Sequence, residues 1–224
     1  MVTENEFNLM RWSSTIPLCD DLWFGMQVRN IAIVDFTVLR GIESEAAQAF
    51  IERERTPTDI LLPLSALSQM WIFSVYEFLR TWRQRAKQII EAAEKVAAID
   101  EEGRTTTLSE IVEAAKEKER MVKNAPTWHS LHLEQVTDCA FIASVREFWD
   151  FSEPIFREAE ALRVTLAKHE IPKTRGLVAE APGYGRMNHF TGSMYWFVTL
   201  KDESQVQIDR RKLADALFRI NESS

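Results

Sequence analysis

The sequence predicts a mainly α fold: a helical bundle with long helices, followed by a small C-terminal β-hairpin and helix. Only seven glycines and seven prolines occur among 224 residues, and this scarcity favours long uninterrupted helices over a turn-rich β architecture. Apolar residues recur every three or four positions from Leu64 to Val96, which is the spacing of one helix face. Near the C-terminus the pattern changes to alternation, which is typical of strands.

The clearest element is a helix from about Leu64 to Val96. At ~1.5 Å per residue, it would be roughly 50 Å long. Pro63 suits its first turn, because a proline there loses no hydrogen bond, and the cluster at 100–103 would stop it. Its apolar stripe should be buried along the whole length. The stripe consists of Leu64, Leu67, Trp71, Val75, Phe78, Trp82, Ala86, Ile89, Ala93 and Val96.

The same reasoning divides the chain into three parts. Residues 1–56 are an N-terminal segment that packs on the bundle, 57–171 form the helical bundle, and 172–224 form a loop, a β-hairpin and a closing helix. Within the first part, the segment 28–39 fits a strand or a buried helix equally, because short apolar runs do not separate the two. Further helices are expected from Glu43 to Arg55, from about Leu108 to Lys123, from Pro126 through Trp149, and from Glu153-Pro154 to about Glu170.

The C-terminal part begins with an aperiodic loop at 172–191. Residues 194–200 then alternate as in a strand, 201–204 make a turn, and Val206 and Ile208 lie on a returning strand. Asp209 is a good N-cap for the closing helix. A two-stranded hairpin is marginally stable alone, so we expect this part to pack on the bundle or on a partner.

Charge and cysteine content favour a soluble cytoplasmic protein. With 27 basic and 34 acidic residues the net charge is −7, which gives no overall attraction to nucleic acid or to an anionic membrane. Cys19 and Cys139 have no Cys-x-x-Cys partner, so we expect reduced, packed thiols. The first residues are acidic, unlike a signal peptide. No apolar run approaches the ~18–20 residues that span a bilayer, so we expect no membrane segment.

Arg163 and His169 lie near the end of the last predicted bundle helix, within the segment ALRVTLAKHE. This segment resembles the signature of the HEPN family of helical RNases and nucleotide-binding domains, and the resemblance covers residues 60–171. It implies a paired protomer, with His169 moving the proton of a ribose 2′-hydroxyl, Arg163 holding the scissile phosphate, and no metal. Val164 stands where the RNase members usually carry a polar residue. A packed or capping role for His169 is the alternative.

Basic residues gather after Arg163. Residues 163–186 contain five basic and two acidic side chains, and this local excess would attract an anionic ligand. An ordinary solvated loop is the alternative. The Gly-rich run at 181–186 lacks the features of a P-loop or a dinucleotide fingerprint. The ligand-binding candidates are Lys168, Lys173, Arg175, Tyr184 and Arg186.

Two other patterns give weaker indications of a metal site or an RNA-binding surface. His129 and His132 lie one turn apart but have no third and fourth ligand at suitable spacing, so we expect no metal site and no cofactor. The run RTWRQRAK at 80–87 interleaves basic residues with Trp82, as in some RNA-binding surfaces. Burial of Trp82 and pairing of the charges with Glu77 and Glu91 explain the same pattern.

The expected function is that of a helical-bundle interaction protein that dimerises or docks on a protein partner. The stripe with Trp71 and Trp82, and the edge of the hairpin, would supply the interfaces. The alternative is a metal-independent HEPN-like RNase that uses Arg163 and His169 in a toxin or antiviral defence setting, with RNA as its partner. A sensor of a small anionic ligand is a third hypothesis.

Overall fold

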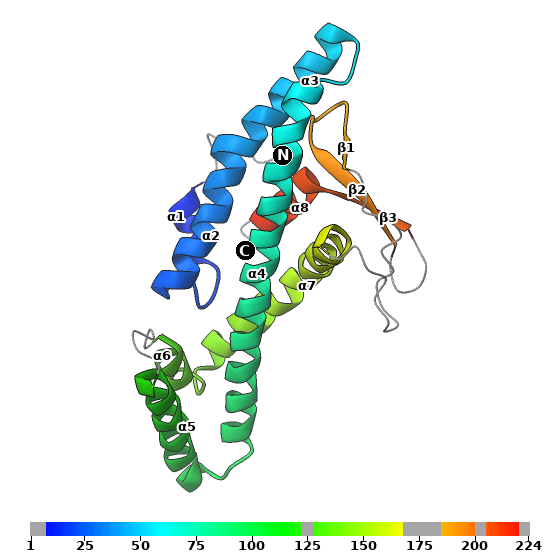
Figure 1. The fold of residues 1–224 in the computed structure, drawn as a ribbon. Coiled ribbons are helices and arrows are strands. Elements are labelled where there is room, and N and C mark those ends of the chain that lie inside the picture. Colours follow the sequence, from blue (N-terminus) through cyan, green and yellow to red (C-terminus); the bar gives the residue numbers. More distant parts are fainter. Residues whose placement is uncertain (1–7, 122–127, 168–184, 200–204, 220–224) are drawn as a thin grey trace.

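The structure is a computed structural model, and it describes residues 8–121, 128–167, 185–199 and 205–219. It confirms the predicted mainly α fold with a small sheet and a closing helix (Figure 1). The elements are α1 (Leu9–Ser14), α2 (Leu22–Val34), the π-helix η1 (Asp35–Leu39), α3 (Arg40–Arg53), α4 (Thr58–Ala97), α5 (Glu101–Met121), α6 (Trp128–Glu134), α7 (Cys139–Ala167), β1 (Arg186–Met187), β2 (Met194–Thr199), β3 (Gln205–Asp209) and α8 (Arg210–Phe218).

The N-terminal part is helical. Residues 28–39, which fitted a strand or a helix from the sequence, form a helix, and α2, η1 and α3 follow one another without a break. The expected helix from Glu43 is the second half of this continuous rod. The rod ends where Glu54 adopts a left-handed conformation at φ 50°. In Figure 1 it runs alongside the upper half of α4.

The long central helix α4 confirms the apolar stripe. Trp71 and Trp82 are buried, and each indole N–H finds a backbone carbonyl in the N-terminal part. Trp71 Nε1 donates to Ile31 O at 2.9 Å, and Trp82 Nε1 donates to Pro17 O at 2.8 Å. The start of the helix was predicted wrongly: it begins at Thr58, so Pro63 lies inside it and not in its first turn.

Two other helix boundaries differ from the prediction. The acidic cluster at 100–103 begins α5, because the Asp100 side chain accepts a hydrogen bond from the Gly103 N–H at 3.1 Å and so caps the new helix. The helix expected from residue 126 through Trp149 is instead two helices, α6 and α7, separated by a turn at 135–138. Asp138 caps α7 by accepting from the Ala140 N–H at 2.8 Å.

Pro154 lies inside α7, where a restart of the chain was expected. In the turn before this proline, the carbonyl of Trp149 accepts two side-chain hydrogen bonds, from Arg83 Nη1 at 3.1 Å and from Ser152 Oγ at 3.2 Å. Arg83 also pairs with Glu153, and its guanidinium lies 3.8 Å from the centre of the Trp149 ring. Arg80 and Lys87 pair with Glu77 and Glu91 as expected, whereas Arg83 is buried between α4 and α7 and links the two helices.

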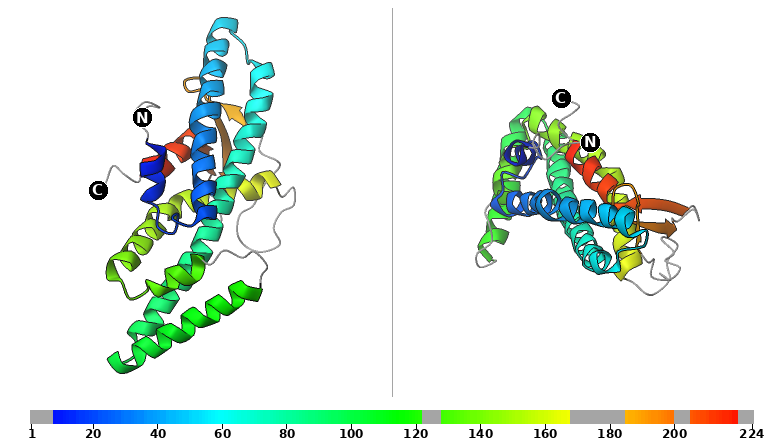
Figure 2. Two further views of the ribbon diagram at one scale, coloured as in Figure 1. Left: turned by 90° about the vertical axis from the view of Figure 1, so that its left-hand side faces the viewer. Right: turned by 90° about the horizontal axis from the view of Figure 1, so that it is seen from above.

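The sheet has the order β1-β2-β3 and is antiparallel throughout. The predicted strands and the Asp209 N-cap are confirmed, and β1 is an addition within the segment expected to be a loop. Trp196, Val198 and Ile208 are buried on the side that faces the helices. Figure 2 shows α8 running from the sheet toward α1, and Phe218 of α8 packs edge-on against Trp12 of α1.

The closing helix is joined to the rod by a buried network of ion pairs. Arg210 is completely buried; its Nη1 donates to Asp35, and its Nε donates to Glu43 Oε1 at 2.6 Å. Arg40 donates to the second oxygen of Asp35 at 2.7 Å, and Arg211 Nε donates to the second oxygen of Glu43 at 2.7 Å. Each buried carboxylate is therefore shared by two guanidinium groups, which compensates its loss of water.

Gly192 allows the loop before β2 to lie close to α3. Gly192 has φ +72°, and a Cβ at this position would lie 1.7 Å from the Glu43 carbonyl oxygen. The loop before β2 therefore packs directly on the backbone of α3, and only a residue without a side chain fits there.

The length and apolar composition of α4 bear on the question of a membrane segment. Within the described residues, α4 is long and apolar enough to cross a membrane by length and composition. The core helix of a soluble protein meets the same criterion, and the middle of α4 packs against α2 and α7. The expectation of no membrane segment stays a prediction.

We expect Arg210→Ala to lower the free energy of unfolding by about 3–5 kcal/mol, because Asp35 and Glu43 would keep buried charge without their shared partner. Urea denaturation measures the loss. Arg219→Ala, at an exposed position at the end of the same helix, is the control and should change stability by about 0.5 kcal/mol or less. Equal losses in the two variants would contradict a stabilising role for the network.

The two thiols should differ in reactivity. Cys139 is exposed, so its expected packing was wrong, whereas Cys19 is buried. Burial, together with Asp20 and Asp21, raises the pKa of the Cys19 thiol well above its usual range, which keeps it protonated and unreactive. We expect a colorimetric thiol reagent at about pH 8 to modify one thiol in the folded protein and two after denaturation. Rapid reaction of two native thiols would contradict the packing of Cys19.

Candidate interaction surface

The predicted catalytic pair cannot be assembled from the described residues. Arg163 lies on α7, is half-buried, and its guanidinium sits 5.0 Å from the centre of the Tyr76 ring on α4. This contact gives Arg163 a packing role between two helices. His169 lies outside the described residues. The HEPN resemblance and the RNase alternative therefore stay predictions.

The predicted ligand-binding residues are described at one position only. Arg186 is exposed on β1, and its guanidinium lies 5.5 Å from the centre of the Phe197 ring on β2. The other four, Lys168, Lys173, Arg175 and Tyr184, lie outside the described residues. Arg163 and Arg186 thus contact different aromatic rings on different elements.

The histidine pair shows no metal-binding arrangement. Across the described ranges, no group of three or more His, Cys, Asp or Glu side chains is placed to hold a metal ion. His132 is buried and its Nε2 lies 2.9 Å from Asp20 Oδ1, a hydrogen bond that lowers the pKa of Asp20. His129 is partly buried, and desolvation lowers its pKa.

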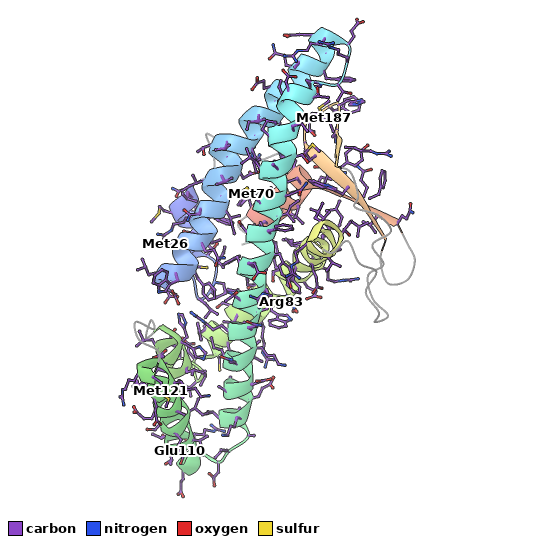
Figure 3. All side chains as sticks on the ribbon, viewed as in Figure 1. Met26, Met70, Arg83, Glu110, Met121 and Met187 are labelled. Carbon is purple, nitrogen blue, oxygen red and sulfur yellow. The ribbon has the colours of Figure 1, made fainter. Side chains whose placement is uncertain are left out.

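The interfaces expected from Trp71 and Trp82 are not available, because both side chains are in the core. Exposed apolar residues gather instead on the outer side of α2. Trp23 is 55% exposed, and Met26 and Ile33 are each 43% exposed. Figure 3 shows Met26 on the side of α2 that points away from α4.

These side chains follow a regular spacing. Steps of three and four residues connect Trp23, Met26, Asn30, Ile33 and Thr37, all of which are exposed, and this is the spacing of the seam of a coiled coil. We call these five residues the outer stripe. It runs from the start of α2 into η1, where Val38 is also exposed at 39%.

The opposite side of α2 forms part of the core. Phe24 packs edge-on against Phe78 of α4 with ring centres 6.1 Å apart, and Val28 and Ile31 are buried. α2 is therefore apolar on both sides. A helix of this kind is normally covered all round, whereas a surface helix carries polar residues on its outer side.

The outer stripe carries no charge and few polar groups that need a hydrogen-bond partner. Thr37 Oγ1 donates to Ile33 O at 2.6 Å, so its hydroxyl is satisfied within the helix. Arg29 is the one charged residue of α2, and its Nε donates to Ser13 Oγ at 3.2 Å beside α1. The side-chain amide of Asn30 has no hydrogen-bond partner among the residues that the structure describes.

The chain was compared with known proteins in three ways. No family model matches it, no curated protein matches it, and no solved structure matches it.

Sequence reasoning missed this surface for a physical reason. Apolar residues on both sides of a helix remove the contrast between a polar and an apolar face, so the helical period was hidden in 28–39. The signal that could have found it is the spacing of the larger residues, Trp23, Met26 and Ile33, together with the single charge of α2.

We expect Arg163→Ala to lower the free energy of unfolding by about 0.5–1 kcal/mol through loss of the contact with Tyr76. Thermal or urea denaturation measures this, with Arg157→Ala at an exposed position of α7 as control.

RNA incubated with the protein in excess EDTA should remain intact. Cleavage by the wild-type protein that disappears in Arg163→Ala, while the variant remains folded, would favour the RNase alternative.

Proposed function

We propose that this protein is an interaction module that binds an uncharged, apolar helix of a partner along the outer stripe. The observation that carries the proposal is the exposed seam of Trp23, Met26 and Ile33 on a helix that is already packed on its other side. Contiguous exposed apolar side chains at regular helical spacing are a common feature of helix-docking surfaces.

Contacts with α4 hold α2, and therefore the outer stripe, in place. Trp71 is hydrogen-bonded to the backbone of α2 at Ile31, and Arg85 of α4 pairs with the buried Asp21 at the start of α2. Arg85 also lies 4.3 Å from the centre of the Phe24 ring. A surface that is ordered before binding loses little conformational entropy on binding, which favours affinity.

Trp23 is the expected centre of the binding energy. Tryptophan is enriched among the few interface residues that dominate affinity, because it buries a large apolar area with few rotatable bonds. Met26 and Ile33 would extend the contact along the seam, and the absence of charge along the stripe means that no ion has to lose its water.

Photo-crosslinking tests the proposal. We expect a photoreactive amino acid at position 26 to give one discrete protein adduct in the expressing cell, because a partner helix would lie against the stripe. Mass spectrometry identifies the adduct. The same group at Met121, which is 81% exposed on α5, is the matched control for an apolar residue outside the stripe.

Ile33→Lys should abolish the adduct at position 26, since burying an unpaired ammonium in a helix seam is unfavourable. Circular dichroism checks that this variant remains folded. No adduct at position 26, or equal adducts at positions 26 and 121 that Ile33→Lys does not change, would contradict the proposal.

A further inference from the structure

We infer that the partner helix is α2 of a second copy of this chain, antiparallel to the first, with the two-fold axis beside Asn30. This inference rests on the proposed function, because it names the occupant of the same stripe. A two-fold contact uses the same patch on both copies, so the patch must be complementary to itself. The spacing, the hydrogen bonding and the charge of the outer stripe each meet this condition.

The two ends of the stripe are equidistant from Asn30, and Met26 and Ile33 lie four positions before it and three positions after it. Trp23 and Thr37 each lie seven positions from it, which is about two helical turns. Antiparallel pairing about Asn30 places the bulky Trp23 of each copy opposite the small Thr37 of the other. A large residue opposite a small one at both ends keeps the two helices evenly separated. Parallel pairing would instead bring the two tryptophans together at one end.

Asn30 is the polar group that the contact must satisfy. Its side-chain amide has no partner among the residues that the structure describes, and burying it unpaired would cost about 1–3 kcal/mol. At a two-fold axis, the amide N–H of each copy can donate to the amide oxygen of the other. A single asparagine in an apolar seam also fixes the register of paired helices, since other registers leave it unsatisfied.

The lack of charge along the outer stripe allows a second copy to bind there. Two copies of a chain with net charge −7 repel one another, and a contact between them is most favourable where neither carries charge. The outer stripe has no charged side chain, and Arg29 beside it is bonded to Ser13. A helix that lies on a membrane surface usually carries several Lys or Arg residues, and α2 carries one basic residue only.

The position of α2 leaves room for this contact. In the left panel of Figure 2, the rod formed by α2, η1 and α3 lies at the front of the molecule, with α1 beside it. The side of α2 that carries Met26 faces outward. Two copies can therefore approach along α2 without displacing an element of the described fold.

Disulfide cross-linking in the full chain tests the geometry. Cys139→Ser removes the exposed thiol, and Cys19 is buried. In this background we expect Asn30→Cys to form a disulfide-linked dimer under mild oxidation. A mixture of Trp23→Cys and Thr37→Cys chains should form mixed dimers, whereas Trp23→Cys alone should not cross-link. Efficient cross-linking of Trp23→Cys with itself, or none in the mixture, would overturn the antiparallel pairing.

Light scattering tests the assembly without cross-links. The chain has a mass of 25.9 kDa, and we expect twice this mass at micromolar concentration. Ile33→Lys should weaken the dimer at least tenfold, while Met121→Lys should leave it unchanged. Circular dichroism of both variants excludes unfolding. A wild-type protein that remains monomeric at 100 μM would overturn the inference.

The proposed function and the inference fail in different ways. A monomer whose position 26 cross-links to another protein, with loss in Ile33→Lys, overturns the second copy and leaves the proposed function in place. Flotation with phosphatidylcholine vesicles, with and without phosphatidylglycerol, tests the remaining class of partner. We expect the wild-type protein to stay unbound, and binding that Ile33→Lys abolishes would overturn both.

Discussion

The buried ion pairs around Arg210 determine how the rest of the molecule is arranged. Asp35 and Glu43, both fully buried, hold the guanidinium of Arg210 between the N-terminal rod and the C-terminal part of the chain. Asp35 can reach Arg210 only if its side of the rod faces inward. This requirement fixes the rotation of α2 about its axis, so that Trp23, Met26 and Ile33 face outward.

The π-helix belongs to the same arrangement. The backbone N–H of Arg40 donates to the carbonyl of Asp35, five residues before it, and the side chain of Arg40 donates to the carboxylate of the same residue. π-helical turns are rare and often occur at functional positions. Here the turn directly precedes α3, and Thr37 within it is the last residue of the outer stripe. A local feature of the backbone thus connects the core to the candidate surface.

The sequence predicted those parts of the fold in which one face alone is apolar. The stripe with Trp71 and Trp82, the alternation in β2 and the cap at Asp209 were all visible, because contrast between faces reveals the period. The boundaries of α4 and α7 were predicted wrongly because prolines usually mark the ends of helices. Pro63 and Pro154 instead lie inside helices that tertiary packing stabilises. The pairing of Arg210 with Asp35, 175 positions apart, leaves no local pattern in the chain.

The candidate site was less predictable than the fold. Catalysis by Arg163 and His169 was inferred from a short motif, and the surface now proposed depends on which side of α2 faces the core. That orientation follows from long-range contacts with α4 and α8, which sequence spacing alone cannot supply. That the protein is an interaction module remains a proposal. The proposed binding surface is the outer stripe of α2 and not the apolar stripe of α4.

The most direct measurement of the central claim is the solvent access of Trp23 in the assembled protein. Acrylamide quenching of fluorescence, taken as the difference between wild type and Trp23→Phe, isolates this residue from the other six tryptophans. We expect its quenching to fall as the protein concentration rises, because a second α2 covers it. Equal quenching of Trp23 at all concentrations would contradict the account.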